Sequence, residues 1–396
     1  MRATIEASTI VLPEASNLRN CPAIVAIPVR NEADRIRRCL AALAVQRDRF
    51  GAAIEPGAFV VLLLINNSTD GTAELAREAA AGLPYPLEIL DASLTHDATA
   101  GGARRRAMQE AAARLRDCGS EGILLTTDAD SEVSHSWFAD NLAHLEAGAD
   151  CVAGYIDAEP AEIVSHGPVF LARGRLEDTY LRLVAEIYAR CDPRPHDPWP
   201  NHRVSSGASL AVKLSAYEAV GGMPGKALGE DGAFTAVLDR RGFKVRHALD
   251  VTVVTSCRLD GRATGGAADT MRYRRDVPNA TCDEDLEPAS ATLRRAVFRG
   301  ALRRAHRQNE LPDALSRIFG KNVPRFDNCE TFADIWGQVE ARHPDLLSRR
   351  VLRPSDLSRQ IAAAGFILRH LRLDRPATSA PVDRCLRAEP HVLLDA

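Results

Sequence analysis

Short apolar segments alternate with helix-forming stretches through the first half of this chain, and this alternation limits the possible folds more than any other feature. Residues 59–65 are apolar throughout, as expected of a strand buried on both faces of a sheet. Alternation of this kind predicts right-handed βαβ units, so we expect an α/β fold with a mostly parallel sheet flanked by helices. The predicted strands cover residues 23–29, 59–65, 87–90, 123–127 and 151–155, and the helices between them cover residues 30–45, 69–81, 100–115 and 134–146.

The remainder of the chain continues this pattern and then changes character. Further helices are predicted at residues 168–190 and 233–241, and further strands at residues 205–212 and 251–256. After residue 265 the sequence is rich in arginine and helix-forming residues and has few strand patterns. We therefore predict an N-terminal extension over residues 1–20, an α/β domain over residues 21–265 and a helix-rich C-terminal region over residues 266–396.

Composition is that of an ordinary soluble globular protein, with 45% hydrophobic and 26% charged residues. The net charge of −3 gives no general attraction to nucleic acid, so we expect no nucleic-acid partner. Residues 59–65 form the longest apolar stretch, which is far too short for a transmembrane segment, and we expect no signal peptide. Nine scattered cysteines without a C-x-x-C pair argue against structural zinc and disulfides, and favour a cytoplasmic location.

A pair of carboxylates, Asp128 and Asp130, directly follows the predicted strand at residues 123–127. A bare carboxylate is costly to bury, whereas a carboxylate just past a strand end can face a crevice where a cation neutralises it. Hard divalent cations prefer oxygen ligands and often share them with substrate phosphates. The pair therefore predicts a metal–diphosphate site at the carboxyl edge of the sheet, where open α/β sheets bind ligands. The alternative is an Asp-rich turn in which Asp130 caps the next helix.

Two polar segments follow the first two strands. In residues 28–32, Pro28 suits a strand end, and Glu32 could accept hydrogen bonds from a sugar or a base. Stabilisation of the first helical turn is the alternative role for Glu32. The small hydrogen-bonding residues of 66–72 predict a tight turn that caps a helix and could also hold a nucleobase edge.

Two more segments open predicted helices. Glycines in residues 100–106 would let backbone N–H groups approach a phosphate, and Arg104 could donate two parallel hydrogen bonds to phosphate oxygens. A solvated basic helix face is the alternative for most arginines of this segment. In residues 229–232, Asp231 at a helix start could take a proton from a hydroxyl, or could simply cap the helix. The small residues 205–209 would allow a ligand to approach closely.

In order and spacing, these segments resemble the inverting family 2 glycosyltransferases, which have the GT-A fold. Each motif is short and weak alone, so the resemblance depends on six of them occurring in the family's order between residues 21 and 260. The matching segments are residues 28–32, 66–72, 103–104, 128–130, 207–211 and 230–231, together with a helix at residues 217–222.

The resemblance implies a hexosyltransferase-type enzyme that uses a nucleotide-sugar donor and a small-molecule or glycan acceptor. It implies Asp130 as a direct ligand of Mn²⁺ or Mg²⁺, with Asp128 near the ribose or the metal. Asp231, beside Glu230, would be the general base that deprotonates the acceptor hydroxyl during an inverting displacement. The donor-binding residues implied by the resemblance are Pro28, Arg30, Glu32, Asn66, Asn67, Asp70, Arg104 and Gly207.

The chain departs from the family pattern in two places. The family commonly has an acidic residue in the nucleobase turn, where this chain has Asn66 and Asn67, so the donor base stays open. Many relatives also have a metal-binding His after the last strand, and here that stretch has none. We expect Arg258 and Arg262 to neutralise donor phosphate in its place, with surface solvation as the alternative role.

The acceptor side is predicted from a proline-rich segment at residues 192–202. Trp199 could stack on a sugar face and His202 could bind hydroxyls, although a rigid surface loop is an equally good interpretation. The basic run at residues 294–304 could contact an anionic membrane surface, but a solvated helix face is the more common meaning of such a run.

Three other functions are compatible with parts of this pattern. A retaining transferase of the same fold would not need Asp231 as a base. A noncatalytic nucleotide-sugar-binding protein would have no reason to keep Asp128, Asp130 and Asp231. A nucleotidyltransferase would want a glycine-rich basic loop after the first strand, and residues 28–34 contain no glycine.

Overall fold

The computed structural model describes residues 5–11, 23–95, 97–119, 121–261, 264–326, 329–347 and 349–373, with the backbone alone for residues 5–11. The chain separates into two compact units that interleave along the sequence. The sheet unit comprises Met1–Gly167 and Val204–Tyr273, and the helical unit comprises Pro168–Arg203 and Arg274–Ala396.

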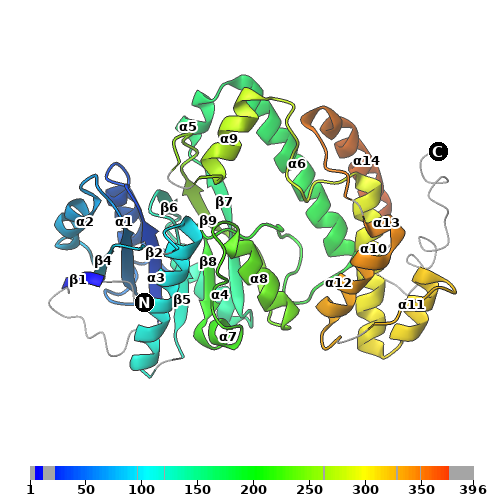
Figure 1. The fold of residues 1–396 in the computed structure, drawn as a ribbon, viewed down its shortest axis with the longest axis horizontal. Coiled ribbons are helices and arrows are strands. Elements are labelled where there is room, and N and C mark those ends of the chain that lie inside the picture. Colours follow the sequence, from blue (N-terminus) through cyan, green and yellow to red (C-terminus); the bar gives the residue numbers. More distant parts are fainter. Residues whose placement is uncertain are drawn as a thin grey trace. The chain divides into compact units, whose positions relative to one another are not determined.

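Within the described residues, the sheet unit contains one nine-stranded mixed sheet with the order β1-β4-β3-β2-β5-β8-β7-β9-β6 (Figure 1). Strands β4, β3, β2 and β5 run parallel, β8 is antiparallel to β5 and β7, and β7 is parallel to β9. The edge strands β1 and β6 are antiparallel to their neighbours. The strands are β1 Ile5–Val11, β2 Ala23–Val29, β3 Val60–Asn66, β4 Leu87–Ala92, β5 Ile123–Thr126, β6 Ser131–Val133, β7 Cys151–Ala158, β8 Leu210–Lys213 and β9 Val245–Thr255.

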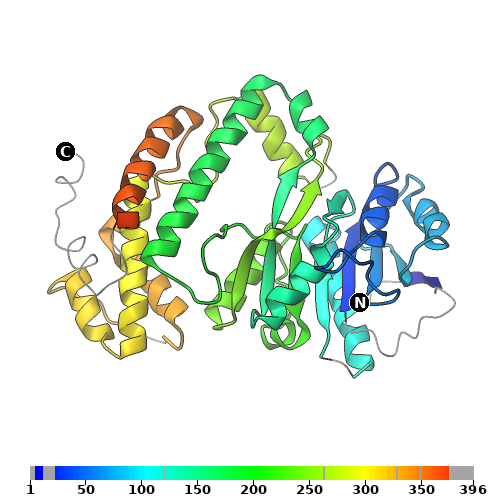
Figure 2. The same cartoon turned by 180° about the vertical axis from the view of Figure 1, so that it is seen from behind.

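Both faces of this sheet are buried, which explains the uninterrupted apolar runs in the sequence. Along β3, Val61, Leu63 and Ile65 face one core, whereas the alternate residues face the other. The first core includes residues of α1 Ile36–Ala44, α2 Thr72–Ala80 and α4 Trp137–Glu146. The second includes residues of α3 Ala100–Asp117, α7 Leu214–Ala219 and α8 Glu230–Arg240. Figures 1 and 2 view the sheet from its two sides. The predicted α/β fold with a mostly parallel sheet and C-terminal helices is confirmed.

The helical unit is built on α6 Pro168–Cys191, α10 Ala289–Gln308 and α14 Pro354–Leu373, which share one core. A smaller core joins α10 to α11 Leu311–Phe319, α12 Phe332–Arg342 and α13 Pro344–Leu347. Two short elements complete the description, α5 Pro160–Ser165 and α9 Ala267–Asp276. No helix in the described part of the chain has the length and apolar character needed to cross a membrane.

Three arginines of the basic run in α10 differ from the expected solvated or membrane-facing surface. Arg295 is buried and paired with Glu287, while Arg299 and Arg303 contact the buried carboxylate of Asp192. These arginines therefore form ion pairs inside the helical unit instead of a solvated or membrane-facing surface.

Several predicted elements are displaced or were missed. The N-terminal residues were expected to be an extension that is either loose or packed onto the core, and β1 pairs with β4. The alternative in which Asp130 caps a helix is wrong, because β6 follows it directly. Helix α1 begins at Ile36 and not at residue 30. Residues 168–203 group with the C-terminal helices, because α6 packs against α10 and α14. The division into domains ending at residues 20 and 265 stays a proposal.

Candidate active site

Asp128 and Asp130 lie on a tight turn at the carboxyl edge of the sheet. Strand β5 ends at Thr126, and the backbone N–H of Ser131 donates to the carbonyl of Asp128 at 3.1 Å. The chain then reverses into β6, where Ser131 pairs with Thr255 of β9. This reversal presents both carboxylates just beyond the strand end, as the sequence predicts.

Arg104 is buried at the centre of this region and contacts four acceptors. Its Nε donates to Oε1 of Glu230 at 3.0 Å, and one terminal nitrogen donates to both Thr126 Oγ1 and the Gly207 carbonyl at 2.9 Å. The other terminal nitrogen is paired with Asp128. Burial alone would lower the pKa of Arg104, but the charges of Asp128 and Glu230 outweigh it and the pKa is raised. The predicted position of Arg104 near a donor diphosphate stays a prediction.

Asp231 lies in the first turn of α8 and is held by backbone N–H groups. Its Oδ2 accepts from Gly207 at 2.8 Å, and its Oδ1 accepts from Gly232 at 2.7 Å. The turn before the helix depends on Gly229, whose φ of 70° is left-handed. The neighbouring carboxylate of Glu230 is buried against Arg104, and burial raises its pKa. Of the two predicted catalytic carboxylates, Asp231 is therefore the more accessible to an acceptor.

Arg258 lies between Glu32 and Asp130. One of its terminal nitrogens donates to Oε2 of Glu32 at 2.7 Å, and the other pairs with Oε1 of Glu32 and lies 3.2 Å from Oδ2 of Asp130. Burial and the charge of Asp128 raise the pKa of Asp130 to about 7, against the opposing charge of Arg258. The structure thus brings Arg258 to the predicted metal carboxylate, whereas Arg262 lies outside the described residues.

The loops after β2 and β3 are locked together by reciprocal hydrogen bonds. The N–H of Asn31 donates to Ser68 Oγ at 3.0 Å, and the N–H of Thr69 donates to Asn31 Oδ1 at 2.8 Å. Asp70 accepts from the N–H of Ala33 at 3.1 Å. Asp70 therefore helps to hold the two loops together, as do Asn31 and Ser68, which no local sequence pattern singled out.

The two adjacent asparagines of the predicted nucleobase turn have different environments. Asn67 has a left-handed φ of 52° and accepts from the N–H of Leu94 at 2.9 Å, so it fixes the segment after β4. Asn66 is only 1% exposed, and its Oδ1 has no hydrogen-bond partner among the residues that the structure describes. A buried amide oxygen without a partner is costly, so Asn66 is the better candidate for a ligand contact.

The remaining predicted residues are divided between the sheet unit and the helical unit. Pro28 is in β2, in register with Leu64 of β3. Arg30 is exposed, and its guanidinium lies 3.4 Å from the carbonyl of Ala98. Trp199, 41% exposed, and buried His202 belong to the helical unit, and their acceptor role stays a prediction.

A divalent cation fits this donor set only if a bound substrate supplies some of its ligands. Among the described residues, no group of three or more His, Cys, Asp or Glu side chains could enclose a metal ion. Asp128 and Asp130 each place one carboxylate oxygen against an arginine. Mg²⁺-type sites nevertheless often use one or two carboxylates and take their other ligands from substrate phosphates and water. Such an ion would therefore depend on a bound diphosphate.

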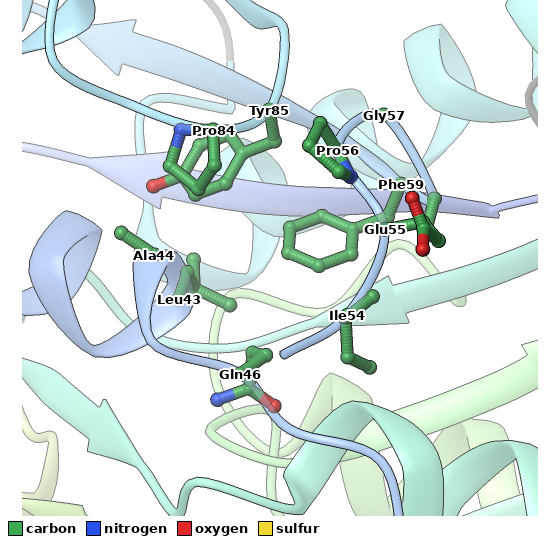
Figure 3. A pocket seen from close by; sticks show the side chains of 11 residues that line it. Leu43, Ala44, Gln46, Ile54, Glu55, Pro56, Gly57, Phe59, Pro84 and Tyr85 are labelled. Atoms are coloured by element: carbon green, nitrogen blue, oxygen red, sulfur yellow. The ribbon is translucent and has the colours of Figure 1, made fainter. Parts of the chain in front are cut away.

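Two small hollows in the sheet unit are too small for a nucleotide. One lies between the end of α1 and the segment before β3, where Leu43, Phe59 and Tyr85 line it (Figure 3). Its volume is about 20 Å³, and that of a second hollow beside Asp130 and Cys39 is about 10 Å³. A volume of this size holds about one water molecule.

Comparison with known proteins finds a family model that matches part of the chain. Residues 24–184 match the family model described as glycosyl transferase family 2. This confirms the motif-based recognition over a span that includes Asp128 and Asp130, while Asp231 and Arg258 lie beyond it. No curated protein matches the chain in sequence.

Several solved structures are similar to this chain at low identity. A mannosyltransferase from Pyrobaculum calidifontis, in complex with GDP-Man and Mn²⁺, is 16% identical, with 92% of this chain and 91% of that chain covered and a TM-score of 0.44. S. aureus TarS in complex with UDP is 15% identical, with 76% and 72% covered and a TM-score of 0.42. Glucosyl-3-phosphoglycerate synthase from Mycobacterium tuberculosis is 15% identical, with 64% and 78% covered and a TM-score of 0.37.

Proposed function

We propose, from the match of residues 24–184 to the glycosyl transferase family 2 model, that this protein transfers a sugar from a nucleotide-diphospho-sugar to an acceptor hydroxyl with inversion. The observation that best supports the proposal is the half-buried carboxylate of Asp231, which two backbone N–H groups hold at the start of α8. The buried Arg104 connects this helix start to Asp128, at the edge where the donor would bind.

In the proposed reaction, Asp231 accepts the proton of the acceptor hydroxyl as the hydroxyl oxygen attacks the anomeric carbon. The bond between that carbon and the donor's phosphate oxygen breaks, and the nucleoside diphosphate departs with the bonding electrons. Two N–H groups fix the orientation of the carboxylate before the acceptor arrives. General-base catalysis of this kind contributes about 10²- to 10⁴-fold to the rate.

The donor would bind along the loops that follow β2, β3 and β5. Asn66 would supply its buried amide to the nucleoside, and Arg258 would turn its guanidinium toward the diphosphate. Glu32, which now pairs with Arg258, would then be free to accept a hydrogen bond from the ribose or the base. Because an amide both donates and accepts, Asn66 is compatible with more than one donor base.

Mn²⁺ or Mg²⁺ would be held by Asp130 and Asp128 together with donor phosphate oxygens. When bound, such an ion neutralises charge on the departing diphosphate. The protein's own contribution is to hold the two carboxylates on the β5–β6 turn and to balance their charge with Arg104 and Arg258.

The proposal is tested by Asp231→Asn, a change that keeps the size of the side chain and removes the base. We expect nucleoside diphosphate release from the preferred donor and acceptor to fall about 10²- to 10⁴-fold, with donor affinity unchanged. The control is Asp117→Asn, which alters an exposed carboxylate at the end of α3. Turnover close to that of the control would contradict the base assignment and favour a retaining mechanism, which the anomeric configuration of the product would reveal.

A further inference from the structure

We propose that Arg104 is a positioning residue that sets the place of the base Asp231 relative to the donor carboxylate Asp128. This inference rests on the proposed function and gives Arg104 a role different from binding the diphosphate. It predicts that Arg104 acts through other residues and does not touch the substrate.

The first observation is that the guanidinium is already surrounded by protein acceptors. Arg104 is 6% exposed, and its three nitrogens donate to Glu230, Thr126, the Gly207 carbonyl and Asp128. Removing a buried charge from such partners is costly, because each carboxylate would be left without its counter-charge. A diphosphate would therefore have to break this network in order to reach Arg104.

The second observation is that two routes lead from Arg104 to the base. The carbonyl of Gly207 accepts from Arg104, and the N–H of the same residue donates to Oδ2 of Asp231 at 2.8 Å. Glu230, which also accepts from Arg104, directly precedes Asp231 in the first turn of α8. Both contacts restrain the backbone that carries the base, so a shift of Arg104 would move Asp231.

The third observation is that two glycines make room for this arrangement. A Cβ atom added to Gly207 would overlap Nε and Cζ of Arg104. A Cβ atom added to Gly101, in the first turn of α3, would overlap the carbonyl of Lys226 and lie 2.8 Å from Oε2 of Glu230. The close approach of α3 to residue 207 and to the start of α8 therefore requires residues without side chains at both positions.

The fourth observation is that the same guanidinium contacts Asp128, on the turn between β5 and β6. A guanidinium is planar and rigid, so its donors have a fixed relative geometry. The guanidinium thus fixes the position of Asp128 relative to Glu230 and Gly207. Arg104 therefore couples the donor side of the site to the acceptor side.

The test measures kcat and KM in Arg104→Gln, Arg104→Lys and Gly207→Ala, with Arg106→Gln as the matched control. Arg106 lies on the same helix and forms a partly exposed pair with Glu110. We expect kcat to fall about 10²-fold in Arg104→Gln, the usual effect of misplacing a catalytic group by about 1 Å. KM for the donor should change less than about threefold, because the proposal gives Arg104 itself no contact with the donor.

The other variants separate charge from geometry. Arg104→Lys keeps the charge but loses the planar set of donors of the guanidinium. Its kcat should therefore lie between those of wild type and Arg104→Gln. Gly207→Ala keeps Arg104 and both carboxylates but displaces the guanidinium, and kcat should again fall while Arg106→Gln stays at the wild-type value. A raised donor KM with an unchanged kcat in the Arg104 variants would overturn the proposal, because it would show direct binding of the donor.

Amide hydrogen exchange gives a readout that does not need turnover. The N–H of Gly207 should exchange faster in Arg104→Lys than in wild type, and unchanged exchange would overturn the proposal. A wild-type enzyme that turned over no donor would refute the proposed function, while exchange at Gly207 would still decide whether Arg104 holds this residue. If Arg104→Gln fails to fold, Arg104→Lys and Gly207→Ala provide the same comparison with the charge retained.

Discussion

At the residue scale, each of the two site arginines is paired with two carboxylates. Arg104 holds Asp128 and Glu230, while Arg258 holds Glu32 and Asp130. Breaking such a pair leaves a charge without its partner. A ligand that enters the site must therefore provide a new partner for that charge. A divalent cation that arrives alone must displace Arg258 from Asp130, whereas a cation that arrives with a diphosphate brings a new partner for the guanidinium.

This competition predicts an effect of Arg258→Gln on metal binding. Without the guanidinium, Mn²⁺ alone should bind on the order of tenfold more tightly, a gain of about 1.4 kcal/mol. Calorimetric titration of Mn²⁺ into the variant and into wild type measures the difference. Arg240→Gln, at the exposed end of α8, is the control. Equal or weaker Mn²⁺ binding in Arg258→Gln would show that Arg258 does not compete with the ion.

The sequence predicts the identity of the site residues better than their contacts. Asp128 and Asp130 follow an apolar strand, which is a local signal, and the structure places them as predicted. The partners of Arg104 lie up to 126 residues away in the sequence, so no local pattern reveals them. Asn67 accepts a hydrogen bond from the N–H of Leu94, and Asp70 accepts one from the N–H of Ala33. These roles too depend on contacts between loops that are distant in the sequence.

At the element scale, the strands that are buried on both faces are predicted well because their apolar runs are continuous. The sequence did not predict β6, which is only three residues long, or the edge strand β1. Each of them is formed by pairing with a strand that is distant in the sequence. Helix α10 shows the same limit in the helical unit. Its basic residues suggest a surface, yet Arg299 and Arg303 contact the buried Asp192.

This buried ion cluster predicts a pH-dependent effect of Asp192→Asn. Burial alone would raise the pKa of Asp192, but the hydrogen bonds from Arg303 and the charge of Arg299 outweigh it and lower the pKa. The ionised carboxylate therefore stabilises the fold above its unfolded pKa of about 3.9, and this stabilisation is lost as the pH falls through the folded-state pKa.

We expect Asp192→Asn to lower the free energy of unfolding at neutral pH by about 3–5 kcal/mol, because two arginines lose a buried partner. Urea denaturation at a series of pH values measures this difference, which should shrink below about pH 4. Glu284→Gln, which changes an exposed carboxylate in the same unit, is the control. A difference that stays constant with pH would contradict the role of the Asp192 charge.

At the scale of the whole molecule, the chain builds two units with separate cores from interleaved segments. The family match ends at residue 184, inside α6, so it covers part of both units. Periodicity in the sequence shows that residues 168–190 form a helix, but it cannot show which core that helix joins. The assignment of α6 depends on its packing against α10 and α14, which begin at Ala289 and Pro354, far along the chain from α6.

The central claim is that the sheet unit binds a nucleotide-sugar together with a divalent cation. The most direct measurement is a thermal-shift series with UDP-, GDP-, CDP- and dTDP-sugars, each with Mn²⁺ and with EDTA, on wild type and Asp130→Asn. A ligand that binds the folded state raises the melting temperature by mass action. We predict a shift with one nucleotide that requires Mn²⁺ and disappears in Asp130→Asn. No shift with any donor, or a shift that neither EDTA nor the substitution changes, would contradict the account.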